Sequence, residues 1–245
     1  MNQIDRVFER VFGDHSPRPH RDRVSLAHRI LRARGRAHLH RDREPQNLTD
    51  PQRVFRRLVA SRTGQLLNVV EAARRSGLRQ EVARRDIAEL LEQRKIMLLP
   101  AHPASGIEGG RRPPKLHVID LGWLATELGW DSSGQVMARR GLGALVETAV
   151  VAEWAHLFHR NDEEPDFCYW ASGPGREIDL VIQRDGLLHA VEVKSTHLPV
   201  NRHADGIKSW FGRWQKVIPA VVACRTEEPV DLIYGIRAVP WHLDW

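Results

Sequence analysis

Apolar residues near the start of the chain recur at helical spacing, three and four positions apart, in residues 4–11 and again in residues 54–59. Between these segments, REPQNLTDP has the composition of a loop, with Thr49 or Asp50 as a helix N-cap and Pro51 as the first helical residue. We therefore expect a basic helical N-terminal region over residues 1–60.

The pattern changes after Leu66. LLNVVEAARRSGL predicts a helix that ends at Gly77, and EVARRDIAELLEQRK predicts a second helix with Val82, Ile87, Leu90 and Leu91 facing inward. Two apolar strands follow, IMLLP and KLHVID, separated by AHPASGIEGGRRPP, which has the composition of a mobile loop. Helix, turn, helix and β-wing in this order predict a winged-helix module over residues 61–130.

The last part of the chain begins with a strongly apolar helix, GLGALVETAVVAEWAHLF, and continues with strand patterns in FCYWAS, EIDLVIQ and HAVEVKS. A helix around GIKSWFGRWQK and a strand in VIPAVVACR come next, and the helix favours packing of Trp210, Phe211 and Trp214 in the core over stacking on bases. Helices flanking a mixed sheet predict an α/β domain over residues 136–245.

Asp185-Gly186, between two alternating strands, predicts a tight hairpin. Because side chains alternate along a strand, Glu192 and Lys194 share one face, and Asp179 shares a face of the partner strand with Glu177 and Val181. Ile178, Leu180 and Ile182 are then expected on the opposite, core-facing side. We expect Asp179, Glu192 and Lys194 to converge on the polar face of the hairpin.

Such a group suits a hard divalent cation. Mg²⁺ is held through one or two carboxylates, with water and substrate phosphate completing its coordination, and it lowers the pKa of bound water. Lys194 would orient or deprotonate that water or stabilise the developing charge. A fourth acid, Glu147, lies in an otherwise apolar helix, where a charge must reach a cation or solvent. For any one of these acids, simple exposure to water is the more ordinary explanation.

Glu147, GREID (175–179) and EVKS (192–195) together resemble the PD-(D/E)XK nuclease superfamily, whose fold is that of restriction endonucleases. From about Arg53 onward, LLNVVEAARRSGL, PKLHVIDLGWLA, GALVETAVVAEW, GREIDLVI and AVEVKS resemble the DUF4143 region that follows AAA-type ATPase modules. The resemblance implies metal ligation by Asp179, Glu192 and the Val193 carbonyl, with Mg²⁺ or Mn²⁺ as cofactor. It also implies a catalytic Lys194 and a helix-borne acid at Glu147. Because the sequence has no G-x-x-x-x-G-K-[ST], ATP hydrolysis by this chain is not expected; either the chain is a truncated or standalone descendant of that family, or its ATPase is a separate polypeptide.

The net charge of the chain favours a polyanionic partner. Lysine and arginine outnumber aspartate and glutamate 37 to 31, for a net charge of +6, and the excess is densest between His15 and Arg43. In the predicted winged helix, the second helix and the wing would present five residues to DNA. These are Gln80, Arg84, Arg85, Arg111 and Arg112. The alternatives, a solvated basic face and a module that packs only against neighbours, have roughly equal weight.

The thirteen histidines show no zinc-site spacing, and the two cysteines are far apart, so a core role for Cys168 and Cys224 is expected. With no secretory leader and no membrane-length apolar run, a cytoplasmic protein is predicted. Two kinds of function therefore stay open. One is a metal-dependent nuclease that acts on DNA. The other is a non-catalytic module that binds DNA or a protein partner and could serve as an accessory to a separate ATPase.

Overall fold

A computed structural model describes residues 2–13, 26–38, 48–105, 112–137, 141–173, 175–214 and 218–241. The chain divides into two compact units. The sheet unit comprises Met1–Asp22, Leu99–Arg112 and Glu153–Trp245, and the helical unit comprises Arg23–Leu98 and Pro113–Ala152. Helices and a mixed sheet together make an α/β protein, as the sequence predicted.

The sheet unit is built on six strands in the order β4-β5-β6-β7-β9-β8. Neighbours from β4 to β6 are antiparallel, β6-β7-β9 are parallel, and β8 returns antiparallel to β9. The sheet is therefore mixed, as predicted. The strands are β4 (Phe167–Gly173), β5 (Arg176–Arg184), β6 (Leu187–Val193), β7 (Ala220–Cys224), β8 (Val230–Asp231) and β9 (Arg237–Pro240), with the 3-10 turn η3 (Ile233–Gly235) before β9.

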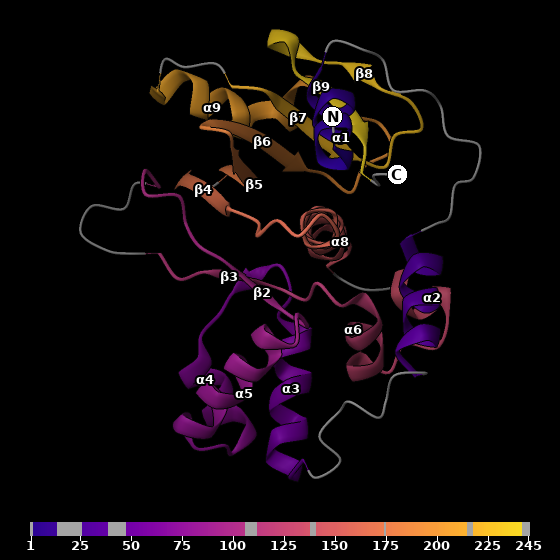
Figure 1. The fold of residues 1–245 in the computed structure, drawn as a ribbon, viewed down its shortest axis with the longest axis vertical. Helices are drawn as coiled ribbons and strands as arrows, with labels where there is room; N and C mark the ends of the chain where they lie inside the picture. Colours follow the sequence, from indigo (N-terminus) through magenta and orange to yellow (C-terminus); the bar gives the residue numbers. More distant parts are fainter. Residues whose placement is uncertain are drawn as a thin grey trace. The chain divides into compact units, whose positions relative to one another are not determined.

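Helices cover both faces of this sheet. Ala190 of β6 belongs to a buried cluster with Ile207 and Trp210 of α9 (Asp205–Trp214), which follows the 3-10 turn η2 (Asn201–Ala204). The next residue back along β6, His189, contacts the ring of Phe8 in α1 (Gln3–Phe12), with centroids 4.7 Å apart. Since adjacent strand residues point to opposite faces, α9 and α1 lie on opposite sides of the sheet (Figure 1).

The outer edge of β4 is also covered. The Tyr169 N–H donates to the Pro100 carbonyl at 2.9 Å, and the His102 N–H donates to the Tyr169 carbonyl at 2.6 Å. Further along, the Trp170 indole donates to the Ala104 carbonyl at 3.3 Å. The first part of the predicted 101–114 loop is thus bound along an edge strand, where it satisfies backbone groups that would otherwise be open.

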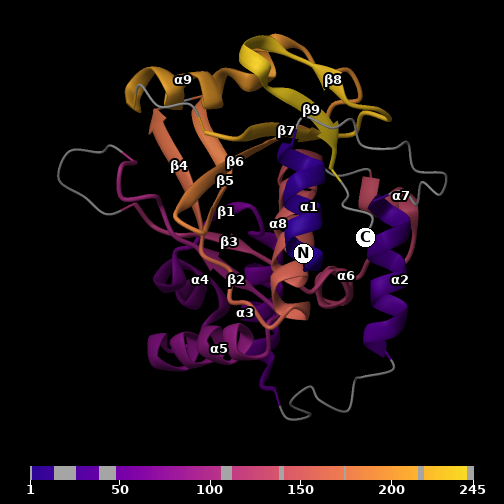
Figure 2. The same ribbon diagram turned by 45° about the horizontal axis from the view of Figure 1, so that its top comes forward.

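The helical unit holds a second, three-stranded sheet in the order β1-β3-β2. Helix α4 ends at Gly77, whose φ of 72° is the left-handed conformation of a helix C-cap, as predicted. The elements, visible also in Figure 2, are α2 (Leu26–His38), α3 (Asp50–Ser61), β1 (Gln65–Leu66), α4 (Val69–Ser76), α5 (Gln80–Glu92), β2 (Met97–Leu99), β3 (Lys115–His117), α6 (Leu121–Leu128), α7 (Ser133–Met137) and the first part of α8 (Leu142–Arg160).

The buried face of α5 differs in part from the predicted one. Ile87 and Leu90 are buried as expected, whereas Leu91 is 36% exposed and Asp86 is buried. Asp86 is accommodated because the Arg56 guanidinium, itself buried in α3, lies 3.6 Å away. The helical unit therefore contains an ion pair at a position that apolar periodicity alone does not reveal.

No helix in the described part of the chain is long and apolar enough to cross a membrane.

Candidate functional site

The predicted hairpin between β5 and β6 is present. Its strands pair antiparallel from Arg184↔Leu187 at the turn to Leu180↔Val191. Asp185 and Gly186 occupy the turn with φ values of 52° and 74°, the left-handed pair that a two-residue hairpin turn requires. This turn fixes the register, so it brings the two motif-bearing strands together.

Strand β5 carries a β-bulge beside Asp179. Cys168 pairs with Val181 and Trp170 with Ile178, so two steps along β4 match three along β5. Ile178 and Val181 consequently belong to the same buried cluster under α9. The predicted strict alternation, with Ile178 and Val181 on opposite faces, is wrong here because the extra residue resets the side-chain phase. The bulge lies in the segment that carries Asp179.

Asp179 closes the end of the β5–β6 ladder. Its Oδ2 accepts a hydrogen bond of 2.9 Å from the Val193 N–H, beyond the last backbone pair. The Asp179 side chain is buried, with 5% of the residue exposed. A carboxylate therefore replaces a backbone carbonyl as acceptor, and it is held against the strand that carries Glu192.

Glu192 and Lys194 lie next to it. The Lys194 ammonium contacts Glu192 Oε1, and the Lys194 side chain is 34% exposed whereas that of Glu192 is only 4% exposed. Glu192 Oε2 is buried and has no hydrogen-bond partner among the described residues. The structure thus brings together Asp179, Val193, Glu192 and Lys194, as the motif predicted, and leaves one carboxylate oxygen unsatisfied.

The electrostatics follow from two acids sharing one ammonium. Burial, and then the nearby Asp179 carboxylate, raise the pKa of Glu192 well above its ordinary value, although Lys194 opposes them. Burial lowers the pKa of Lys194, but Glu192 and more weakly Asp179 outweigh that effect, so the pKa lies above its usual value. The charged form of Lys194 is therefore favoured, whereas the charged form of Glu192 is disfavoured as long as no further cation is present.

Glu147 lies in the helical unit, and there it is paired. Its Oε1 accepts from the Lys115 ammonium of β3 at 3.0 Å and lies 3.7 Å from Nε2 of the buried His117. We expected an acid in this apolar helix to pair with a cation or reach solvent, and Lys115 is that cation. The role of Glu147 as a catalytic acid stays a prediction.

The predicted DNA-contacting residues have different environments. Gln80, Arg84 and Arg85 of α5 are exposed in the helical unit. Arg112 is only partly exposed, and its Nε is buried without a hydrogen-bond partner among the described residues. Arg111 lies outside the described residues, as does most of the basic stretch between His15 and Arg43.

No group of three or more histidine, cysteine, aspartate or glutamate side chains suited to a metal is found in the parts of the chain that the structure describes. A cation at Asp179 and Glu192 would therefore rely on two carboxylates.

The two cysteines and the aromatic residues of α9 belong to the core. Cys224 is buried and Cys168 packs against the core, both with free thiols, and burial raises the pKa of Cys168 to about 12. Trp210 is buried as predicted, Phe211 packs against the same cluster, and the Trp214 side chain lies outside the described residues.

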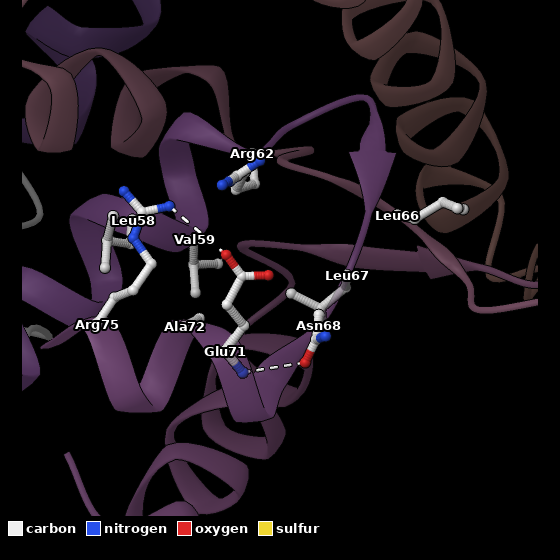
Figure 3. Close-up of a pocket in the computed structure, with 9 residues that line it drawn as sticks. All are labelled: Leu58, Val59, Arg62, Leu66, Leu67, Asn68, Glu71, Ala72 and Arg75. Atoms are coloured by element: carbon white, nitrogen blue, oxygen red, sulfur yellow. Dashed lines mark hydrogen bonds and ion pairs between the residues drawn. The ribbon is translucent and has the colours of Figure 1, made fainter. Parts of the chain in front are cut away.

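Pockets away from these carboxylates are found in each unit of the described part of the chain. One, between α3 and α4, has a volume of about 50 Å³; in it Glu71 and Arg75 pair at 3.8 Å beside Leu58 (Figure 3). The other, about 310 Å³, is in the sheet unit and is lined in part by Phe12, Phe211 and Arg237. Neither includes a predicted catalytic residue. A pocket of 50 Å³ is far below the roughly 300 Å³ at which small-molecule sites begin.

Sequence reasoning missed Gly206, in the first turn of α9. A Cβ atom added there would lie 1.9 Å from the Glu177 carbonyl oxygen and 2.9 Å from Glu192 Oε2. The first turn of α9 therefore closes directly over the carboxylates. A glycine within a predicted helix was the available signal, because glycine there costs helix stability unless close packing requires it.

Residues 142–243 match the family described as a domain of unknown function (DUF4143). Similar curated proteins include uncharacterized proteins of Mycobacterium bovis and Mycobacterium tuberculosis, each 29% identical over 164 residues. The matched segment covers 66% of this chain and 36% of each relative, so the chain spans about a third of their length. No solved structure matches.

Proposed function

We propose that this protein binds Mg²⁺ or Mn²⁺ at Asp179 and Glu192 and hydrolyses phosphodiester bonds of DNA. The observation that carries the proposal is the convergence of two buried carboxylates and Lys194 at the open end of the β5–β6 hairpin. The PD-(D/E)XK resemblance of the same residues supports it. The helical and mixed-sheet arrangement around the hairpin is compatible with a restriction-endonuclease-like domain.

The donor set fits a hard divalent cation. Glu192 Oε2 is buried without a partner among the described residues, and the cluster has two acids for one ammonium. A buried polar atom without a partner costs about 1–3 kcal/mol, which a cation would offset. Asp179 and Glu192 would hold it, with the Val193 carbonyl as a third ligand, and carboxylate and carbonyl oxygens are the donors that Mg²⁺ prefers.

When bound, the cation supplies a more acidic water and neutralises charge on the phosphate. Lys194 holds the position from which an ammonium can orient the attacking water or stabilise charge on the phosphoryl oxygens. In the reaction, water oxygen bonds to phosphorus, one P–O ester bond breaks, and the leaving oxygen takes up a proton. The partial exposure of Lys194 leaves it open to a substrate, whereas Glu192 is sheltered behind it.

Basic residues flank the carboxylates. Partial burial, followed by the charges of Arg202 and Lys194, lowers the pKa of His203, and Asp205 opposes this effect. Since these charges act on His203, Arg202 and Lys194 share one neighbourhood. Arg202 and Arg176 are exposed. Arg202 and Lys194 supply positive charge for a polyanion such as a nucleic-acid backbone, although the exposed Glu177 and the partly exposed Asp205 lie in the same neighbourhood.

The test is cleavage of supercoiled plasmid with Mg²⁺ or Mn²⁺ by the wild type, Asp179→Asn and Asp185→Asn. Asp185 is the matched control because it is exposed in the hairpin turn, where asparagine tolerates positive φ. We expect cutting by the wild type and Asp185→Asn, and loss of at least a hundredfold with Asp179→Asn or EDTA. Cleavage that survives Asp179→Asn would contradict the proposal.

A non-catalytic module is the second candidate. The order of elements from α3 to β3, with its three-stranded sheet, supports a winged-helix module, and α5 leaves Gln80, Arg84 and Arg85 exposed. Retention of duplex DNA without cutting, lost on Arg84→Ala with Arg85→Ala and steeply dependent on salt, would favour this function. A separate ATPase partner remains a third proposal, tested by co-purification.

A further inference from the structure

The first turn of α9 meets an oxygen that has no partner. Glu192 is 3% exposed, and its Oε2 has no hydrogen-bond partner among the described residues. The site that a Cβ atom of residue 206 would occupy lies 2.9 Å from this oxygen. A buried carboxylate oxygen is thus aimed at the amino end of a ten-residue helix.

Gly206 is what allows the approach. The same Cβ atom would lie 1.9 Å from the Glu177 carbonyl oxygen, where contacts shorter than 3.0 Å are essentially never seen. The obstacle is backbone, which cannot rotate away as a side chain can. With any other residue at this position, the first turn of α9 would have to move about 1 Å away from β5.

From this contact we infer that Gly206 is a positioning residue for the carboxylate site: its missing side chain lets α9 close on Glu192 and hold that carboxylate beside Asp179 for a divalent cation. The inference rests on the proposed metal binding and adds a residue outside the motif. Groups that orient a metal ligand are typically worth about 10- to 100-fold in affinity. A displacement of about 1 Å exceeds the roughly 0.5 Å within which a binding site must be held.

Helix α9 supplies its own control at Gly212. A Cβ atom there would meet nothing within 4 Å, so Gly212→Ala changes the same helix by the same methyl group without a clash. Alanine favours a helix over glycine by about 1 kcal/mol at either position. Any difference between the two variants therefore reports the contact at residue 206 and not helix propensity.

The experiment measures Mn²⁺ affinity by electron paramagnetic resonance on the full chain, with folding followed by circular dichroism in EDTA. We expect Gly212→Ala to bind like the wild type and Gly206→Ala to bind at least tenfold more weakly while remaining folded. Equal binding by both variants would overturn the role of Gly206 and leave the metal site standing. If the wild type takes up no Mn²⁺, or if Glu192→Gln binds Mn²⁺ as tightly as the wild type, the proposed metal site and with it the proposed function fail as well.

A second measurement does not depend on the folding of a variant. In the wild type, Mn²⁺ should slow amide hydrogen exchange in peptides that cover residues 203–208, and leave peptides from α1 unchanged. Binding of Mn²⁺ without added protection in the first turn of α9 would overturn the inference, even if Gly206→Ala cannot be folded.

Discussion

Glu192→Gln should have opposite effects on stability with and without metal. In EDTA, the wild type buries a carboxylate that has an unsatisfied oxygen and a second acid nearby. The neutral amide removes that charge from the buried site. The variant should therefore be the more stable protein when no cation is present, although glutamine also loses the contact with Lys194.

The magnitude follows from these two contributions. The charge on a buried, unsatisfied carboxylate raises its penalty above the cost of about 1–3 kcal/mol that an unpaired amide atom would still have there, by an amount on the order of 2 kcal/mol, whereas an ion pair to a lysine that is 34% exposed contributes at most about 1 kcal/mol. The net expectation is about 1–2 kcal/mol in favour of glutamine. For a chain of this size that corresponds to a rise in Tm of roughly 2–8 °C.

Metal should reverse the order. A ligand at one hundred times its Kd stabilises the folded state by about 2.7 kcal/mol, and the variant lacks one ligand. Thermal unfolding at pH 8 in EDTA and in Mn²⁺ measures both cases. Glu228→Gln, at an exposed loop position, is the matched control and should follow the wild type. A Glu192→Gln protein less stable than the wild type in EDTA would refute the reasoning.

The same carboxylate gives a pH dependence with a definite sign. Burial and Asp179 raise the pKa of Glu192 in the folded chain, so the unfolded chain releases this proton first. The folded chain then binds more protons, and its stability falls as the pH rises from the ordinary glutamate pKa through the raised one. Urea denaturation in EDTA should show this decline in the wild type and a smaller one in Glu192→Gln.

Two further predictions concern the helical unit. Arg56→Met should lower the free energy of unfolding, measured by urea denaturation, by about 3–5 kcal/mol, because it leaves the buried Asp86 without its cation. The double variant with Asp86→Leu should recover most of that loss. A loss below about 1 kcal/mol in the single variant would argue against the ion pair. Burial lowers the pKa of His117 to about 3. Below about pH 6.5, His117 is therefore protonated in the unfolded chain but stays neutral in the folded chain. Stability should then fall by up to about 1.4 kcal/mol per pH unit as the pH drops, and His117→Asn, compared with the wild type between pH 6.5 and 5, should show a shallower slope; equal slopes would contradict the burial of a neutral imidazole.

Local signals were sufficient for much of the fold. The Asp185-Gly186 turn, the end of α4 at Gly77 and the alternation in β6 each depend on neighbouring residues, because turn geometry and strand pleat are set over a few residues. From these the hairpin follows, and with it the proximity of Asp179 to Glu192. The mixed α/β class was predictable for the same reason.

Other features depend on segments that are distant in sequence. The bulge that resets β5 beside Asp179 is visible only in its pairing with β4, and the partner of Glu147 is Lys115, thirty-two residues earlier. Arg56 is buried because α5 brings two acids to it, Glu89 at 3.0 Å and Asp86 at 3.6 Å. Gly206 matters because α9 folds back over β5 and β6. Periodicity within one segment carries no information about which segment will pack against it, so tertiary contacts alone decided where these charges are satisfied and where Glu192 is not.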